Sequence, residues 1–150
     1  MPWLNASSAG RVAYEDFQQR LWRPVVAASA SADASKVLSV VAPYFFDGAK
    51  FDTLSSKVRE QVTSNLREWQ ALGRSSDAFA NIRRVDVAAI VAPTLLMEGH
   101  NTLALHRILN AQYAALLPNR RLVVIEHATH QMWDEQPVRC REETLQFLAQ

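Results

Sequence analysis

The chain has 150 residues, of which 49% are hydrophobic and 21% charged, and its formal net charge is +1. This length is enough for one modest domain with a real core. A nearly neutral chain offers no strong field to a polyanion, so we expect neither nucleic acid nor a membrane surface as a partner.

Cysteine content and apolar runs bear on the compartment. The single cysteine, Cys140, excludes an internal disulfide and suits a reducing environment. No apolar run approaches the roughly 20 residues that span a bilayer. The first residues also lack the basic and apolar regions of a secretory signal. We therefore expect a soluble, cytoplasmic protein.

Residues 1–84 have mostly helical patterns. Small polar residues over positions 1–10 predict an irregular entry. From Arg11 onward apolar residues recur at helical spacing, and Pro24 predicts a kink or a break in this helix. A second helix is expected after Asp33, which is suited to cap it.

A third helix is predicted between the hydroxyl residues at 53–56 and Gly73. Its apolar stripe comprises Val58, Val62, Leu66 and Trp69. Gly73 follows as a C-terminal cap residue would. We interpret residues 1–84 as one helical region.

Residues 85–150 follow a different pattern. Two short apolar runs rich in β-formers, Thr94 to Met97 and Leu122 to Ile125, flank an amphipathic helix over Leu103 to Leu117. Pro137 is well placed as the first residue of a closing helix. This βαβα order predicts a parallel strand pair within an α/β fold, with function at the carboxyl ends of the strands.

Several of these residues carry a family resemblance. Ala92-Pro-Thr-Leu-Leu-Met-Glu-Gly99 resembles the seventh strand of an α/β-hydrolase. Leu117 to Ile125, followed by Ala128-Thr129-His130, resembles the eighth strand and the catalytic-histidine loop. Trp133 to Pro137 leads into a segment similar to the last helix. Residues 11–80 resemble more loosely the helical cap that many members carry.

The resemblance implies roles for three residues. His130 takes the place of the catalytic base, and Asn101 stands where the family usually has the acid, an aspartate. No G-x-S-x-G nucleophile motif occurs, and the nearest approximation places Ser8 as the nucleophile. Ser8 lacks the preceding strand of a nucleophile elbow. Glu98 lies one residue before Gly99 and is expected to point into the sheet.

The resemblance also implies what is missing and what the chain does. The first six strands of the family's sheet have no counterpart, so the α/β unit is incomplete as a lone chain. We expect a relative of hydrolases of small hydrophobic esters or lactones, impaired or inactive alone. The alternative is a non-catalytic small-molecule-binding or interaction module. The strands would need a partner surface, either a second copy or a complementing N-terminal half.

Other kinds of site have little support in the sequence. The four histidines lack the spacing that places two metal ligands on one helical face, so no metal and no cofactor is expected. An all-helical structural protein with two incidental apolar runs is a third interpretation. The turn-forming residues at the ends of both runs argue against it.

Overall fold

The computed structural model describes residues 3–31, 33–79 and 82–149. The chain divides into two compact units, one formed by Tyr14–Ala80 and one by Met1–Ala13 together with Asn81–Gln150. The boundary predicted from the sequence lies between residues 84 and 85, close to the change of unit after Ala80. It does not foresee that the first residues belong with the C-terminal part. Within the described ranges, no helix is long and apolar enough to cross a membrane.

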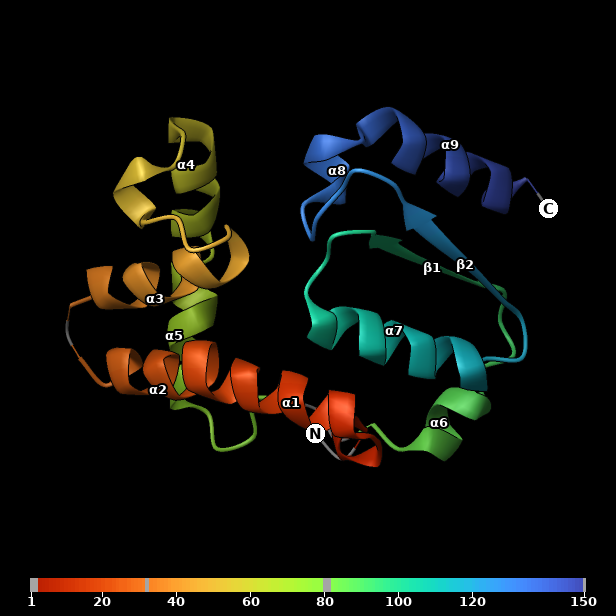
Figure 1. The fold of residues 1–150 in the computed structure, drawn as a ribbon, viewed down its shortest axis with the longest axis horizontal. Helices are drawn as coiled ribbons and strands as arrows, with labels where there is room; N and C mark the ends of the chain where they lie inside the picture. The colour runs from red at the N-terminus through yellow and green to blue at the C-terminus, as the bar shows by residue number, and fades with distance from the viewer. Residues whose placement is uncertain (1–2, 32, 80–81, 150) are drawn as a thin grey trace. The chain divides into compact units, whose positions relative to one another are not determined.

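The first unit is built from helices (Figure 1). Its core contains Phe17, Leu21 and Val25, which recur every fourth residue along one helical stripe and are almost fully buried. After the last residues of α1 (Ser8–Phe17), the elements are η2 (Gln18–Trp22), α2 (Arg23–Ser29), α3 (Ser35–Phe45), η3 (Phe51–Thr53), α4 (Ser56–Ser64) and α5 (Leu66–Arg74).

Three expectations for the helices need correction. The irregular entry is wrong from Ser8 onward, because α1 begins there. The helix predicted up to Gly73 is two helices, since Asn65 ends α4 and precedes α5. Gly73 lies inside α5 rather than after it. A Cβ at Gly73 would lie 2.3 Å from the Ser29 hydroxyl, so this glycine permits close packing between α2 and α5.

The predicted kink at Pro24 takes a specific form. Pro24 lies in the first turn of α2, and a π-helical turn, η2, comes immediately before it. A proline removes one backbone hydrogen bond and crowds the preceding turn, and a π turn is one way for a helix to accommodate such a disturbance.

The second unit is the predicted βαβα arrangement. Strands β1 (Thr94–Gly99) and β2 (Arg120–Ile125) pair in parallel, with Thr94 opposite Arg120 and Gly99 opposite Ile125. This confirms the α/β class and the parallel pair. Strand β1 ends two residues after its predicted run, and β2 begins two residues before its predicted run. The remaining elements are η1 (Leu4–Ala6), α6 (Arg84–Ala88), α7 (Ala104–Leu116), α8 (Met132–Glu135) and α9 (Pro137–Leu148).

Each face of the strand pair packs on a different helix, with α7 and α9 on opposite sides in Figure 1. On the α7 side, Leu96 packs against a cluster of Trp3, Val87 and Leu117. On the α9 side, Met97 joins a cluster that includes Ile125 and Cys140. The side chains of adjacent residues of β1 therefore point to opposite faces of the strand pair, as the two-residue period of a strand requires.

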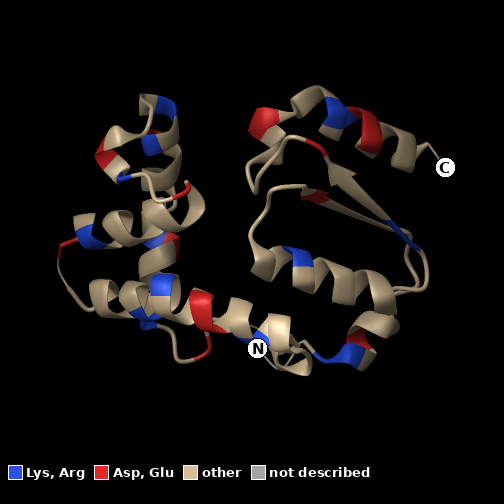
Figure 2. Ribbon diagram, viewed as in Figure 1, with Lys and Arg blue, Asp and Glu red and all other residues tan. Residues whose placement is uncertain are grey.

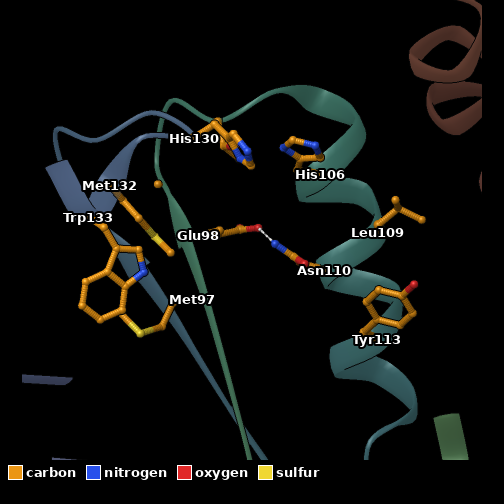
Figure 3. A pocket seen from close by; sticks show the side chains of 11 residues that line it. Met97, Glu98, His106, Leu109, Asn110, Tyr113, His130, Met132 and Trp133 are labelled. Atoms are coloured by element: carbon orange, nitrogen blue, oxygen red, sulfur yellow. Dashed lines mark hydrogen bonds between the residues drawn. The ribbon is translucent and has the colours of Figure 1, made fainter. Parts of the chain in front are cut away.

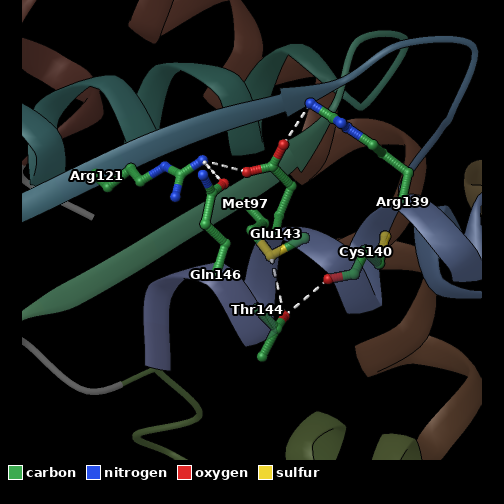
Figure 4. Close-up of polar contacts among 7 residues, drawn as sticks. All are labelled: Met97, Arg121, Arg139, Cys140, Glu143, Thr144 and Gln146. Carbon is green, nitrogen blue, oxygen red and sulfur yellow. Dashed lines mark hydrogen bonds and ion pairs between the residues drawn. The ribbon is translucent and has the colours of Figure 1, made fainter. Parts of the chain in front are cut away.

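An ion network fixes α9 to β2 (Figure 4). The buried carboxylate of Glu143 pairs with both Arg121 of β2 and Arg139 of α9. Arg121 also donates a hydrogen bond to Gln146 at 2.8 Å. Elsewhere, basic and acidic residues are interspersed along the helices of each unit (Figure 2), as the small net charge suggests.

Candidate functional site

The loops that follow β1 and β2 lie against each other at the carboxyl ends of the strands. The amide of His100 donates to the carbonyl of Ile125 at 2.9 Å, and the amide of Asn101 donates to that of Ala128 at 2.8 Å. A Cβ at Gly99 would lie only 2.1 Å from the carbonyl oxygen of Thr129. Only glycine permits this approach, which brings the His130 loop onto the end of β1.

The loop that carries His130 is held from its other side by α8. The amide and hydroxyl of Thr129 donate to the two carboxylate oxygens of Glu135 at 2.5 and 2.8 Å. Earlier in the loop, His127 has a φ of 57°, a left-handed conformation that favours glycine.

A cavity of about 400 Å³ opens between β1, α7 and the His130 loop (Figure 3). Its lining is mainly apolar and aromatic, with a few polar side chains among them. The residues are Met97, Glu98, Gly99, Thr102, His106, Leu109, Asn110, Tyr113, His130, Met132 and Trp133. A largely apolar hollow with a few converging polar groups is the usual form of a small-molecule site.

Two histidines lie together at one end of this cavity. The rings of His106 on α7 and His130 have centroids 4.4 Å apart and planes inclined by 41°. Burial, reinforced by the charge of His130, lowers the pKa of His106 to about 4. His130 is exposed at the rim, yet partial desolvation lowers its pKa as well. Both rings are therefore neutral at neutral pH, the form in which an imidazole accepts a proton.

The cavity also contains a carboxylate that is largely removed from solvent. Glu98 at the end of β1 is 8% exposed, and one of its oxygens accepts a hydrogen bond from the side-chain amide of Asn110 at 2.9 Å. Its side chain points from β1 toward α7 (Figure 3). Among the residues that the structure describes, no lysine or arginine pairs with it.

The three residues that the resemblance singled out are in different places. His130 lines the cavity, whereas neither Asn101 nor Ser8 does. Asn101 is exposed, and its backbone ties the two loops together. Ser8 is exposed in the first turn of α1. The preceding Ser7 caps that helix, because its hydroxyl accepts from the amide of Gly10 at 3.0 Å.

Sequence reasoning missed the contribution of α7 to the site. His106, Asn110 and Tyr113 follow one another at intervals of four and three residues, so they lie on one helical face. Thr102, just before the helix, continues the stripe. This run of polar and aromatic residues beside the apolar core face of α7 could have predicted that the helix contributes to a site. In the described ranges, no three His, Cys, Asp or Glu side chains are grouped to hold a metal ion.

Comparison with known proteins establishes the fold. No family model matches the sequence, and no curated protein matches it significantly. The crystal structure of carboxylesterase CesB (YbfK) from Bacillus subtilis is similar, with a TM-score of 0.60 and 20% sequence identity. The likeness covers 83% of this chain and 44% of the carboxylesterase, so the chain spans less than half of that protein's length. At this identity the likeness shows the fold alone: it is of the α/β class and resembles part of this carboxylesterase, with two strands in the described sheet.

Proposed function

We propose that the chain carries the base and the substrate pocket of a hydrolase of small, mainly apolar esters or lactones, with His130 as the general base. The observation that carries this proposal is the position of His130. It follows β2 on a loop fixed to the end of β1 through Gly99, and it borders an apolar cavity. A base must be neutral at working pH and positioned beside its substrate, and the lowered pKa of His130 is consistent with this.

In this proposal the nucleophile lies outside these 150 residues, and the chain alone has no triad activity. Ser8 begins a helix that Ser7 caps, and it is not on a strand-to-helix elbow. Asn101 takes the position of the acid, but an amide cannot stabilise an imidazolium by charge. Residues 14–80 would act as the helical cap of the substrate site.

The polypeptide that would complete the sheet is expected to pair with β1, along the edge of β1 that does not face β2. The amides of Thr94 and His100 point to β2, since they donate to Asn119 and Ile125. Backbone groups alternate in direction along a strand, so those of the odd-numbered residues, such as Leu95 and Met97, point to the opposite edge of β1. No strand within the described residues occupies that edge. The partner is either an N-terminal half or a second copy.

The pocket can be tested in the isolated chain by NMR. On titration with γ-butyrolactone, the ring resonances of His130 and Trp133 should shift in a saturable way. Those of His127, which does not line the cavity, should stay in place. Ester turnover by the chain should be equal in the wild type, His130→Ala and Ser8→Ala. Unchanged His130 and Trp133 resonances, or turnover that depends on Ser8, would contradict the proposal.

A non-catalytic binding module is the second candidate. The observation in its favour is the composition of the cavity wall, because neither serine nor cysteine is among the described residues that line it. The two candidates differ once a nucleophile-bearing portion is joined to the chain. Fluorophosphonate labelling of the joined protein that disappears in His130→Ala would support the hydrolase, and no labelling would support the binding module.

A further inference from the structure

The Glu98 carboxylate faces the cavity with one hydrogen-bond partner among the described residues. One carboxylate oxygen accepts from Asn110 at 2.9 Å, and the other has no hydrogen-bond partner among the described residues. The side chain is 8% exposed and lines the cavity, so the unpartnered oxygen is accessible from there. A carboxylate oxygen that faces a cavity can accept a charge-assisted hydrogen bond from a cationic ligand.

The described side chains around Glu98 supply no such cation. The cavity lining contains neither lysine nor arginine, and both histidines have a pKa below the ordinary value because of burial. The Glu98 carboxylate therefore has no cationic partner among the described side chains of the lining. Its other walls include the aromatic side chains of Tyr113 and Trp133, which favour apolar groups and attract cations to their ring faces.

We propose that this cavity binds a small organic cation, a primary ammonium on a compact apolar group, with the ammonium at Glu98 and the apolar group against Leu109 and Tyr113. An ammonium donates three hydrogen bonds, and a charge-assisted bond to the open carboxylate oxygen is of the strong kind. The inference rests on the proposed function in one respect, since it concerns the same cavity: a substrate of the proposed hydrolase would carry the ammonium on the apolar part of its ester or lactone.

Pairing of another strand with β1 would not by itself fill this subsite. A strand added to the edge uses backbone groups in the plane of the sheet, whereas the Glu98 side chain leaves β1 toward α7. The ammonium subsite therefore lies beside the sheet, between β1 and Asn110.

The test compares benzylammonium with benzyl alcohol, which have similar shape and differ in charge. We expect calorimetry at neutral pH to give a dissociation constant at least about tenfold lower for benzylammonium in the wild-type chain, because only the ammonium can donate a charge-assisted hydrogen bond to Glu98. In Glu98→Gln, which keeps the shape and an acceptor for Asn110, this preference should disappear while benzyl alcohol still binds.

The matched control is Glu126→Gln, which removes the same charge from an exposed residue on the adjacent loop. Glu126 lies 3.4 Å from the His100 ring and does not line the cavity, so the preference for benzylammonium should persist. If Glu98→Gln does not fold, NMR on the wild type replaces it. The side-chain amide of Asn110 must then shift on saturation with benzylammonium.

Three results would overturn the inference. They are equal affinity for the two compounds in the wild type, a preference that persists in folded Glu98→Gln, and an Asn110 amide that does not respond. Benzyl alcohol binding without a preference for the cation would leave the pocket of the proposed function intact. Binding of neither compound in the cavity would overturn both the cation subsite and the pocket.

Discussion

His106 and His130 face each other across one end of the cavity, but their surroundings differ. His130 is exposed at the rim, whereas His106 is half-buried on α7. The Nδ1 atom of His106 is fully buried and has no hydrogen-bond partner in the described part of the chain. Protonation of His106 would place a charge in this enclosed position, which explains the lowered pKa of about 4.

His106 should make the chain less stable in acid. Between pH 6.5 and about 4 the unfolded state binds a proton at His106 that the folded state does not, so the free energy of unfolding falls as the pH is lowered. The full effect has an upper limit of about 3 kcal/mol. Urea unfolding of His106→Leu should show a correspondingly weaker pH dependence in this window.

The control for this experiment is His127→Asn, which removes a histidine from an exposed turn and keeps a residue that tolerates positive φ. It should retain the acid sensitivity of the wild type. An identical pH dependence in His106→Leu and the wild type would show that His106 is not the group responsible.

The predictability of the site differs from residue to residue. His130 could be predicted because a short motif after a strand marks it. Glu98 and His106 could not be assigned to a cavity, since their environment depends on how α7 packs against β1. The roles of Asn101 and Ser8 were inferred from motif spacing alone. Spacing does not reveal that Asn101 is exposed or that Ser8 begins a helix.

At the level of elements, α1 begins with a serine cap rather than a catalytic turn. Ser7 has extended backbone dihedrals and accepts from the amide three residues on, which is the geometry of a helix N-cap. Ser7→Ala should therefore lower the free energy of unfolding by about 1 kcal/mol. Ser8→Ala should change it little. Chemical denaturation of both variants is the measurement, and equal losses would contradict the capping role.

The attachment of α9 to β2 depends on a buried acid between two arginines. Glu143→Gln would leave Arg121 and Arg139 without their shared carboxylate. Because both arginines are partly exposed, we expect a loss of about 2 kcal/mol, below that for a fully buried pair. Glu142→Gln, one residue earlier and exposed, should cost less than about 0.5 kcal/mol. Similar stability of the two variants would argue against the network.

Sequence patterns predicted the elements of the βαβα unit better than those of the helical unit. Continuous apolar runs with turn formers at their ends gave both strands, and Pro137 does begin α9. The break at Asn65 and the packing role of Gly73 escaped prediction because both depend on neighbouring helices rather than on local spacing.

For the whole molecule, the main feature is an α/β fold that resembles part of a carboxylesterase. The chain spans 44% of the similar carboxylesterase, and its described sheet has two strands. Apolar side chains on β2 and α9, including Leu122, Val124, Leu145 and Leu148, are 40% or more exposed. In the proposed assembly, another polypeptide would cover part of these apolar side chains.

Fluorophosphonate labelling of the purified chain tests the central claim most directly, because the probe reacts with a serine that a histidine base has activated. If His130 is a base whose nucleophile lies outside this chain, the wild type should remain unlabelled, as should Ser8→Ala and His130→Ala. Labelling of the wild type that is lost in both variants would contradict this account and identify Ser8 as the nucleophile.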